Sequence, residues 1–331
     1  MATIKMNSKA QALFKSLQQL NAITKAAYNP SIAPVALALW DKHLDLGNPQ
    51  WKYIKYQSFY YTSQSGTAHV IAMVDKRLPN SGIVGYFACT TAVAGAQVLQ
   101  QAAEWLKEKH CLHDVYGPIN GTLPSDYRLN TSDDYVFPGE PVNPLWHIEA
   151  FTLAGFKVFN KYVSGITKNY KLQIKIAVRK PKKDYRHLTV RPFNTADYSK
   201  DFKIYHNLRN AIFPFQSIYC PVLSLQERIY NSTGKLDPNY CYFLVDGSVT
   251  VGFIMAYAYN NQLIVKTIGL LPDYRGKRLS GQLVKIVHDQ AAKDGLQSAI
   301  YALIREGNAV YKSKRPGVKV FRKYVTMHKT I

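Results

Sequence analysis

The feature of the sequence that most constrains the fold is an order of expected elements that occurs twice. Each half begins with helices, continues through three strands joined by short turns, and then has a long amphipathic helix, a strand, a short helix and a last strand. Turn residues such as Asp246-Gly247 and Asn260-Asn261 separate the strands. At about 150 residues per domain, the 331 residues accommodate two such units. The order predicts an α+β fold of two tandem units, each with a mixed, mostly antiparallel sheet flanked by helices.

The expected elements can be placed by their apolar periodicity and by the Gly, Pro and Asn residues between them. In the first half we expect helices up to about residue 55, strands at 58–63, 68–75 and 82–90, a helix at 94–109, a strand at 114–116, a helix at 145–154 and a strand at 156–167. In the second half we expect a strand at 187–193, helices at 197–213 and 223–232, strands at 240–246, 248–259 and 262–271, a helix to about 294, a strand at 298–304, a short helix from about 307 and a strand at 318–328.

The boundary between the units is expected in a basic, polar segment at 171–186 that contains Lys180-Pro181-Lys182-Lys183. This division leaves residues 1–170 as the first unit and residues 187–331 as the second.

The charge of the chain is strongly positive, because 42 basic and 21 acidic residues give a net charge of +21. Such a charge favours anionic partners, among them nucleic acid, an anionic membrane surface, a phosphorylated cofactor or an acidic substrate. A generally cationic surface also accounts for it. No recognisable nucleic-acid-binding module accompanies the charge, so nucleic acid is a possible partner but not the favoured one.

Other sequence features argue against several classes of protein. The composition, 47% apolar and 19% charged, is that of a folded domain and excludes wholesale disorder. No run of about 18 apolar residues is present and the first twenty residues lack an apolar signal core, so we expect no membrane span and a cytoplasmic location. The four cysteines form no CxxC pair and no Cys/His group has zinc spacing, so we expect no metal.

The segment richest in chemical information is Ile268-Gly269-Leu270-Leu271-Pro272-Asp273-Tyr274-Arg275-Gly276-Lys277-Arg278-Leu279-Ser280-Gly281-Gln282-Leu283. An apolar strand ends at a proline, passes through a basic loop that contains a glycine, and enters an amphipathic helix. Backbone N–H groups at a helix N-terminus, together with the helix dipole, form a site for anions. Gly276 allows close approach of the backbone, and Arg275, Lys277 and Arg278 add charge that suits phosphates.

This strand–loop–helix order resembles the pyrophosphate loop of the GCN5-related N-acetyltransferase (GNAT) superfamily. The family pattern is Arg or Gln, two residues, Gly, one residue, then Gly or Ala, which here aligns with Arg275, Arg278 and Ser280. Arg278 therefore occupies the position of a glycine, and Ser280 that of a glycine or alanine. The order downstream, with Asn308 in a short helix and Gly317-Val318 before a closing strand, also fits the family. The resemblance covers residues 240–331 well.

The first half resembles a group of bacterial acetyltransferase-like proteins built from two units. The resemblance is carried by Gly82-Ile83-Val84-Gly85-Tyr86-Phe87, Trp105-Leu106 and Tyr116-Gly117-Pro118-Ile119-Asn120. Between Thr90 and Gln97, however, the chain reads Thr91-Ala92-Val93-Ala94-Gly95-Ala96, with no basic phosphate loop. We interpret this half as a degenerate GNAT-like unit without a CoA site.

The resemblance implies an N-acyltransferase that binds acetyl-CoA or another acyl-CoA where two parallel strands, 262–271 and 298–304, splay apart. It implies cofactor-binding positions at Ile268, Leu270, Arg275, Gly276, Lys277, Arg278, Leu279, Ser280, Gly281 and Asn308. An amine, whose identity is open, attacks directly in a ternary complex, with an N–H near Leu270 polarising the thioester carbonyl. Tyr311 is the candidate acid for the departing thiolate.

The base that accepts the proton of the attacking amine is not evident in the sequence. The strand 262–271 contains Lys266 and Thr267 but no carboxylate, and Asp246, Glu227 or a water relay remain as candidates. Two rival functions also remain: transfer of a longer acyl chain or of an aminoacyl group from tRNA, and a non-catalytic GNAT-fold protein that binds an anionic partner through its basic surface.

Overall fold

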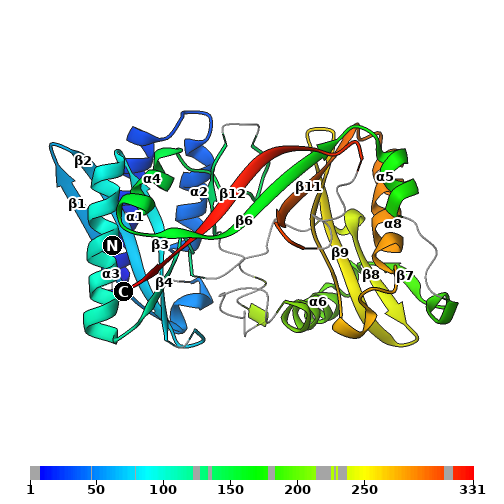
Figure 1. Ribbon diagram of the computed structural model, residues 1–331. Coiled ribbons are helices and arrows are strands. Elements are labelled where there is room, and N and C mark those ends of the chain that lie inside the picture. The colour runs from blue at the N-terminus through cyan, green and yellow to red at the C-terminus, as the bar shows by residue number, and fades with distance from the viewer. Residues whose placement is uncertain are drawn as a thin grey trace, which may run out of the picture.

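The computed structural model describes residues 8–45, 47–78, 80–121, 127–132, 136–177, 183–213, 225–226, 229, 237–308 and 316–331. Twelve strands form one sheet with the order β1-β2-β3-β4-β12-β6-β11-β10-β9-β8-β7, and β5 pairs with β12 beside that path. Among the described pairs, β3–β4 and β10–β11 are parallel and the others are antiparallel. The molecule is elongated, with a group of helices at each end of the sheet (Figure 1).

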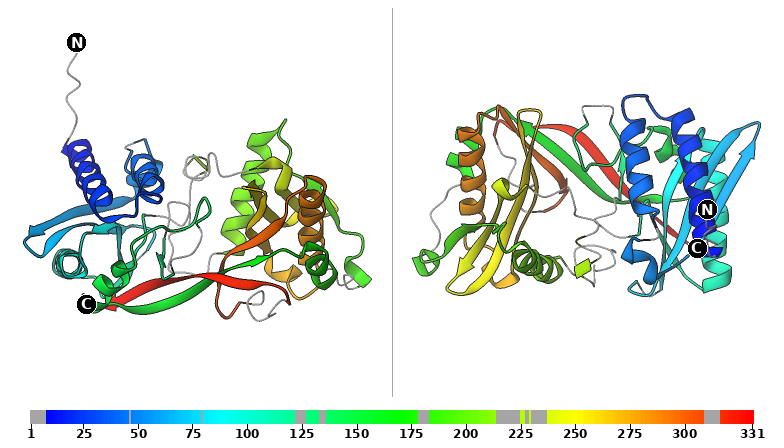
Figure 2. Two further views of the ribbon diagram at one scale, coloured as in Figure 1. Left: turned by 90° about the horizontal axis from the view of Figure 1, so that it is seen from above. Right: turned by 180° about the vertical axis from the view of Figure 1, so that it is seen from behind.

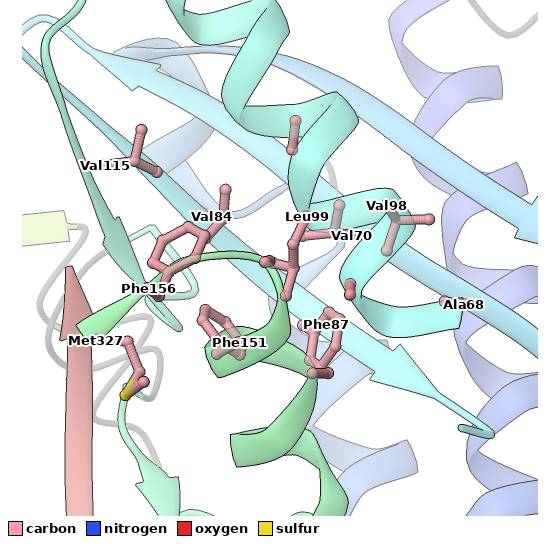
Figure 3. Packing of buried hydrophobic residues seen from close by; sticks show 14 of the residues in the cluster. Ala68, Val70, Val84, Phe87, Val98, Leu99, Val115, Phe151, Phe156 and Met327 are labelled. Atoms are coloured by element: carbon pink, nitrogen blue, oxygen red, sulfur yellow. The ribbon is translucent and has the colours of Figure 1, made fainter. Parts of the chain in front are cut away.

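The N-terminal half contains most of its elements where the sequence predicts them. They are α1 (Ser8–Ala27), α2 (Ala33–His43), a 3₁₀ turn (Pro49–Lys52), β1 (Ile54–Ser63), β2 (Gly66–Asp75), β3 (Ser81–Cys89), α3 (Ala92–His110), β4 (Asp114–Gly117), β5 (Leu129–Asn130), α4 (Trp146–Leu153) and β6 (Lys157–Thr167). Alternate residues of the strands pack on opposite faces: Val70 and Ala72 face the core beneath α3 and α4, whereas Ile71 and Met73 face α1 and α2. Figure 3 shows the first of these cores.

The C-terminal half repeats this arrangement. It contains α5 (Tyr170–Ala177), a 3₁₀ turn (Lys183–Tyr185), β7 (Thr189–Pro192), α6 (Tyr198–Ile212), a 3₁₀ turn (Pro238–Tyr240), β8 (Cys241–Asp246), β9 (Val249–Tyr259), β10 (Gln262–Leu270), a 3₁₀ turn (Pro272–Tyr274), α8 (Ser280–Lys293), β11 (Ser298–Arg305) and β12 (Lys319–Thr330). On β9, Ile254 and Ala256 pack in the core with α8, while Phe253 and Met255 pack in the core with α6. The sheet of this half is therefore covered on both faces.

The two halves exchange their last strands. The end of β6 pairs with β11 of the C-terminal half, with Thr167 opposite Ala299 and Gly165 opposite Tyr301. The end of β12 pairs with β4 of the N-terminal half, with Met327 opposite Gly117. Between these contacts β6 and β12 run antiparallel to each other across the middle of the molecule (Figures 1 and 2). The C-terminus of the chain consequently lies in the N-terminal half of the molecule, beside α3 (Figure 1).

This exchange is the main difference from the sequence-based expectation. The mixed, mostly antiparallel character of the sheet and its flanking helices are confirmed, but the sequence predicts two separate sheets and the structure has a continuous one. Turn residues specify which neighbouring strands form hairpins, whereas nothing local specifies the partner of a strand that pairs across the molecule. The proposed linker 171–186 also contains most of α5, which packs against α8; the division at this segment stays a prediction.

Two expected helices fall largely outside the described residues, namely 223–232 and the short helix from about 307. Of the described helices, none is both long enough and apolar enough to cross a membrane.

The exchange predicts that a substitution near the C-terminus weakens the N-terminal core. Met327 is 1% exposed and packs among core residues of the N-terminal half, so Met327→Ala should lower the free energy of unfolding by about 2–5 kcal/mol. Hydrogen exchange should accelerate in α3 and β4 more than in α8. Val320→Ala, on the same strand but at a side chain 44% exposed, is the matched control and should change stability by less than about 0.5 kcal/mol. Faster exchange confined to α8 and β11 would contradict the assignment of Met327 to the N-terminal core.

Candidate functional site

The parallel strands β10 and β11 pair over only part of their length. Their register runs from Gln262 opposite Ser298 to Val265 opposite Tyr301, although β10 continues to Leu270 and β11 to Arg305. Beyond the last pair the two strands separate, and we call this separation the splay. The splay lies between the two strands where the resemblance implies an acyl-CoA site.

A bulge in each strand coincides with the start of the splay. In β10 the register with β9 shifts between Val265 and Thr267, so that Lys266 is the extra residue. In β11 the register with β6 shifts between Tyr301 and Ile304, and Leu303 within that interval has a φ of +55°. Bulges bend strands and end regular pairing. Two bulges at the same level explain why β10 and β11 part after Val265 and Tyr301.

The loop after β10 leads to the N-terminus of α8, which has no side-chain cap. The residue before the helix is Leu279, and its side chain is fully buried in the core. In the part of the chain that the structure describes, the N–H groups of residues 276–280 donate to no acceptor of the protein, and Gly276, Arg278 and Ser280 are exposed. Uncapped N–H groups at the positive end of a helix dipole can bind an anion.

The shape of this loop is fixed by side chains that bond to its neighbours. Arg275 donates from Nε to the Leu270 carbonyl at 3.1 Å and from its terminal nitrogen to the Ile212 carbonyl at 2.8 Å. The Tyr274 hydroxyl donates to Asp246 at 2.7 Å, and His187 Nε2 lies 2.8 Å from the same carboxylate. Arg275 thus ties the loop to β10 and α6, rather than extending toward a ligand as its charge alone suggests.

Asp246 was one candidate for the base, and its surroundings argue against that role. The hydrogen bonds from Tyr274 and His187 hold the pKa of this carboxyl below its usual value. A carboxylate that is already engaged and made less basic is a poor acceptor for the proton of an amine. Asp246 instead braces the loop. Glu227, the other carboxylate candidate, lies outside the described residues.

Arg278 adopts a backbone conformation that favours glycine, the residue that the family pattern has at this position. Its φ is +65°, in the left-handed region, and Gly276 has a φ of +73°. The position where the family pattern has glycine is left-handed in this chain, and an arginine occupies it. Its side chain is exposed, so the departure leaves the backbone path of the loop intact.

The predicted site residues are largely brought together. Residues 275–281 form one turn of loop and helix, and Ile268 and Leu270 lie half-buried on β10 beside the splay. Asn308 follows β11, with its N–H 3.3 Å from the Arg305 carbonyl. Tyr311, the candidate acid, lies outside the described residues.

The corresponding region of the N-terminal half is closed by its own chain. The parallel pairing of β3 with β4 stops after Ile83 and Tyr116, as in the other half. The Ile119 N–H then donates to the Val84 carbonyl at 2.8 Å, and the Tyr86 N–H donates to Asn120 Oδ1 at 2.6 Å. Backbone groups that a pantetheine would need are therefore already paired.

The helix after β3 is also unavailable to a phosphate. Thr91 caps α3 by accepting from the Ala94 N–H at 3.2 Å, and a Cβ at Gly95 would lie 2.7 Å from that of Ala150. The capped and tightly packed N-terminus of α3 contrasts with the open N-terminus of α8. These contacts support the interpretation of the N-terminal half as a degenerate unit.

Sequence reasoning did not identify a buried polar cluster next to the splay. Glu140 accepts a hydrogen bond from the Tyr324 hydroxyl and one from the Phe137 N–H at 3.2 Å, and Arg322 Nε lies 3.1 Å from its carboxylate. Burial raises the pKa of Glu140 to about 7, although Arg322 and Tyr324 act in the opposite direction. The sequence gives no local sign of this cluster, because a glutamate in a loop rich in Pro, Asn and Asp is ordinarily exposed to solvent. Among the described residues no group of three or more His, Cys, Asp or Glu is placed to hold a metal ion.

Comparison with known proteins agrees with this geometry. Residues 203–312 match the model of the Acetyltransferase (GNAT) family. No curated protein gives a significant match. Over nearly its whole length the chain is similar to the GCN5-related N-acetyltransferase from Sphaerobacter thermophilus, at 14% identity, 97% coverage of this chain, 91% of that chain and a TM-score of 0.54.

Two further solved structures show the same architecture. One is a tandem GNAT protein from the clavulanic acid biosynthesis pathway, at 11% identity, coverage of 98% and 96%, and a TM-score of 0.52. The other is a probable N-acyltransferase of unknown function from Enterococcus faecalis V583, at 11% identity, coverage of 96% and 70%, and a TM-score of 0.54. Residues 203–312 therefore match the GNAT family model, and the chain as a whole has the fold of tandem GNAT proteins.

The left-handed conformation of Arg278 predicts a stabilising substitution. Arg278→Gly should raise the free energy of unfolding by about 0.5–1 kcal/mol, because a left-handed conformation costs about 1–2 kcal/mol for an L residue and the extra freedom of glycine in the unfolded chain offsets part of this gain. Lys277→Gly is the control, since Lys277 has no positive φ and should only lose stability. Chemical denaturation measures both. A loss of stability in Arg278→Gly as large as that in Lys277→Gly would contradict this account.

Proposed function

We propose that this protein is an acyl-CoA-dependent N-acyltransferase with a single acyl-CoA site, in its C-terminal half. The observation that carries the proposal is the contrast between the two halves. The C-terminal half has splayed strands beside an uncapped helix N-terminus, and in the N-terminal half both features are occupied by the chain itself. The match of residues 203–312 to the GNAT family supports the same assignment.

The residues of the loop suit the pyrophosphate of CoA. The N–H groups of residues 276–281 would donate to its oxygens. Gly276 and Arg278 both have left-handed backbones, so the loop turns sharply just before the helix. Gly276 has no atom within 4 Å of the position of a Cβ, so the loop leaves room for a ligand. Lys277, whose ammonium lies 5.4 Å from the centre of the Tyr185 ring, and Arg278 would add positive charge.

The unpaired edge of β10 beyond Val265 would hold the pantetheine arm through backbone hydrogen bonds. The acceptor amine would then attack the thioester carbon, so that a C–N bond forms and the C–S bond breaks. An N–H near Leu270 would stabilise the negative charge that develops on the carbonyl oxygen. The departing thiolate takes a proton, for which Tyr311 remains our candidate, and the ammonium formed by the attack loses one to water or a base. Positioning and stabilisation of the oxyanion would supply most of the rate.

A charge placed in the loop tests the proposed site. Gly276→Asp should weaken binding of acetyl-CoA by a hundredfold or more, because like charges about 4 Å apart at an effective dielectric of about 20 repel by roughly 4 kcal/mol before relaxation. Isothermal titration calorimetry measures the affinity, and we expect one acetyl-CoA per chain in the unaltered protein.

The matched control is Gly295→Asp. Gly295 also has a φ of +73° and no atom within 4 Å of a Cβ, but it lies just past the opposite end of α8. This variant carries the same backbone strain and the same charge, and should bind acetyl-CoA as the unaltered protein does. Equal loss in both variants would indicate an effect of folding rather than of the site. Two acetyl-CoA molecules per chain would show that the N-terminal half also binds, and no binding at millimolar concentration would favour a non-catalytic role.

A further inference from the structure

Both bulges that open the splay are connected to one loop of the N-terminal half. This loop, residues 137–140, lies between β5 and α4 in the sequence and reaches the C-terminal half of the sheet. Phe137 is buried against Ile264 of β10 and Ile300 of β11, on the face opposite α8. The loop is thus a contact of the N-terminal half with the two strands that form the candidate site.

The first connection reaches the bulge of β10. Lys266, the extra residue of that bulge, donates from Nζ to the Gly139 carbonyl. The adjacent carbonyl of Pro138 accepts from the Tyr257 hydroxyl on β9. Gly139 has a φ of +77° and its Cβ position lies 3.4 Å from Lys266 Nζ, so the loop and the lysine are in close contact.

The second connection reaches the bulge of β11 through the exchanged strands. The N–H of Leu303 donates to Ser164 Oγ on β6 at 3.0 Å. Ser164 Oγ lies 3.1 Å from the Tyr324 hydroxyl on β12, and that hydroxyl donates to Glu140. Because the Tyr324 hydroxyl donates its hydrogen bond to Glu140, the Ser164 hydroxyl is the donor in the contact between Ser164 and Tyr324. The chain Leu303–Ser164–Tyr324–Glu140 is buried along most of its length, and Arg322 balances the carboxylate.

We propose that loop 137–140 of the N-terminal half holds the splay open, and that Lys266 and Ser164 are positioning residues for the pantetheine and thioester part of acyl-CoA. The proposal rests on the acyl-CoA site proposed above. It gives the N-terminal half a role in the activity of the other half: its own splay is filled by Ile119 and Asn120, while its loop fixes the geometry of the neighbouring one.

The reason Ser164 matters is the conformation of Leu303. A left-handed backbone is unfavourable for leucine and persists where the surroundings compensate it. The hydrogen bond from the Leu303 N–H to Ser164 is such a compensation. Without it, β11 should relax toward regular pairing, which would narrow the splay but leave unchanged the loop 275–281, because Arg275 ties that loop to β10 and α6 rather than to β11.

The experiment separates the two parts of the ligand. Acetyl-CoA would use both the loop and the splay, whereas ADP carries the pyrophosphate without pantetheine and would use the loop alone. Ser164→Ala should weaken acetyl-CoA binding about tenfold or more and leave ADP affinity within about twofold. Adding Leu303→Gly should restore acetyl-CoA affinity to within about threefold, because glycine adopts the left-handed conformation without support.

A variant on the β10 side tests the same idea independently. Lys266→Met keeps the length of the side chain but removes the bond to Gly139, and should also weaken acetyl-CoA binding selectively. Lys329→Met is its matched control, because Lys329 donates to the Ala154 carbonyl at 2.8 Å within the N-terminal half. Ser16→Ala is the control for Ser164→Ala, since Ser16 is a buried, hydrogen-bonded serine remote from the splay. Neither control should change either affinity.

The outcomes distinguish this proposal from the proposed function. If Ser164→Ala and Lys266→Met weaken ADP and acetyl-CoA equally, or weaken neither, the positioning role is wrong although the site stands. Failure of Leu303→Gly to restore binding would also overturn it. If the unaltered protein binds no acetyl-CoA, the proposed function fails. Hydrogen exchange still tests the connection itself: the Leu303 amide should exchange faster in Ser164→Ala than in Ser16→Ala, and equal rates would refute the connection.

Discussion

The pairing of β6 with β11 and of β12 with β4 connects the two halves through backbone hydrogen bonds in the centre of the sheet. An antiparallel strand that lies inside a sheet forms hydrogen bonds along both of its edges. Each half therefore lacks an interior strand unless the other half supplies it. Two side chains of the exchanged strands contact the opposite half. Met327 of β12 packs in the N-terminal core, and Ser164 of β6 accepts a hydrogen bond from Leu303 beside the splay. A linker alone would have left the halves free to move relative to each other; the exchanged strands fix their relative position.

That fixed position makes an unequal division of function possible. The N-terminal half retains the bulged strand and partly paired neighbour of a GNAT unit, with Tyr86 at a φ of +48°. Its backbone groups are occupied by Asn120, and a Cβ at Gly85 would lie 2.0 Å from the Ile119 carbonyl oxygen. These contacts fill the region of the N-terminal half that corresponds to the candidate site of the other half. The loop 137–140 of this half contacts β10 and β11, the strands of the candidate site.

The sequence predicts what is encoded locally and misses what is encoded by distant pairing. Hairpins joined by Asp246-Gly247 and Asn260-Asn261 appear where expected, and so does the loop from Arg275 to Gly281, because turn residues and apolar periodicity act over a few positions. The strand exchange, the role of Arg275 as a brace and the burial of Glu140 each depend on residues far away in the chain: Ile212 for Arg275, and Arg322 and Tyr324 for Glu140. Composition could indicate a basic, phosphate-binding loop, but it could not indicate which of its arginines bonds to the protein itself.

The buried pair of Glu140 and Arg322 shows what a charged pair contributes where loop 137–140 meets β12. Removing two charges from water costs free energy that their attraction only partly returns, so a buried ion pair is poor evidence of stabilisation. The raised pKa of Glu140, about 7, expresses this cost. What the pair provides is geometric: the carboxylate must meet Arg322, Tyr324 and the Phe137 N–H together. An apolar contact here would tolerate a shift of β12 along β6, whereas the hydrogen bonds of Glu140 with Tyr324 and the Phe137 N–H are directional and do not. The register of β12 on β6 that places Arg322 opposite Ser164 also brings the Tyr324 hydroxyl within 3.1 Å of Ser164 Oγ, which accepts from the Leu303 N–H. The contacts of the buried carboxylate are therefore coupled to the geometry of the splay.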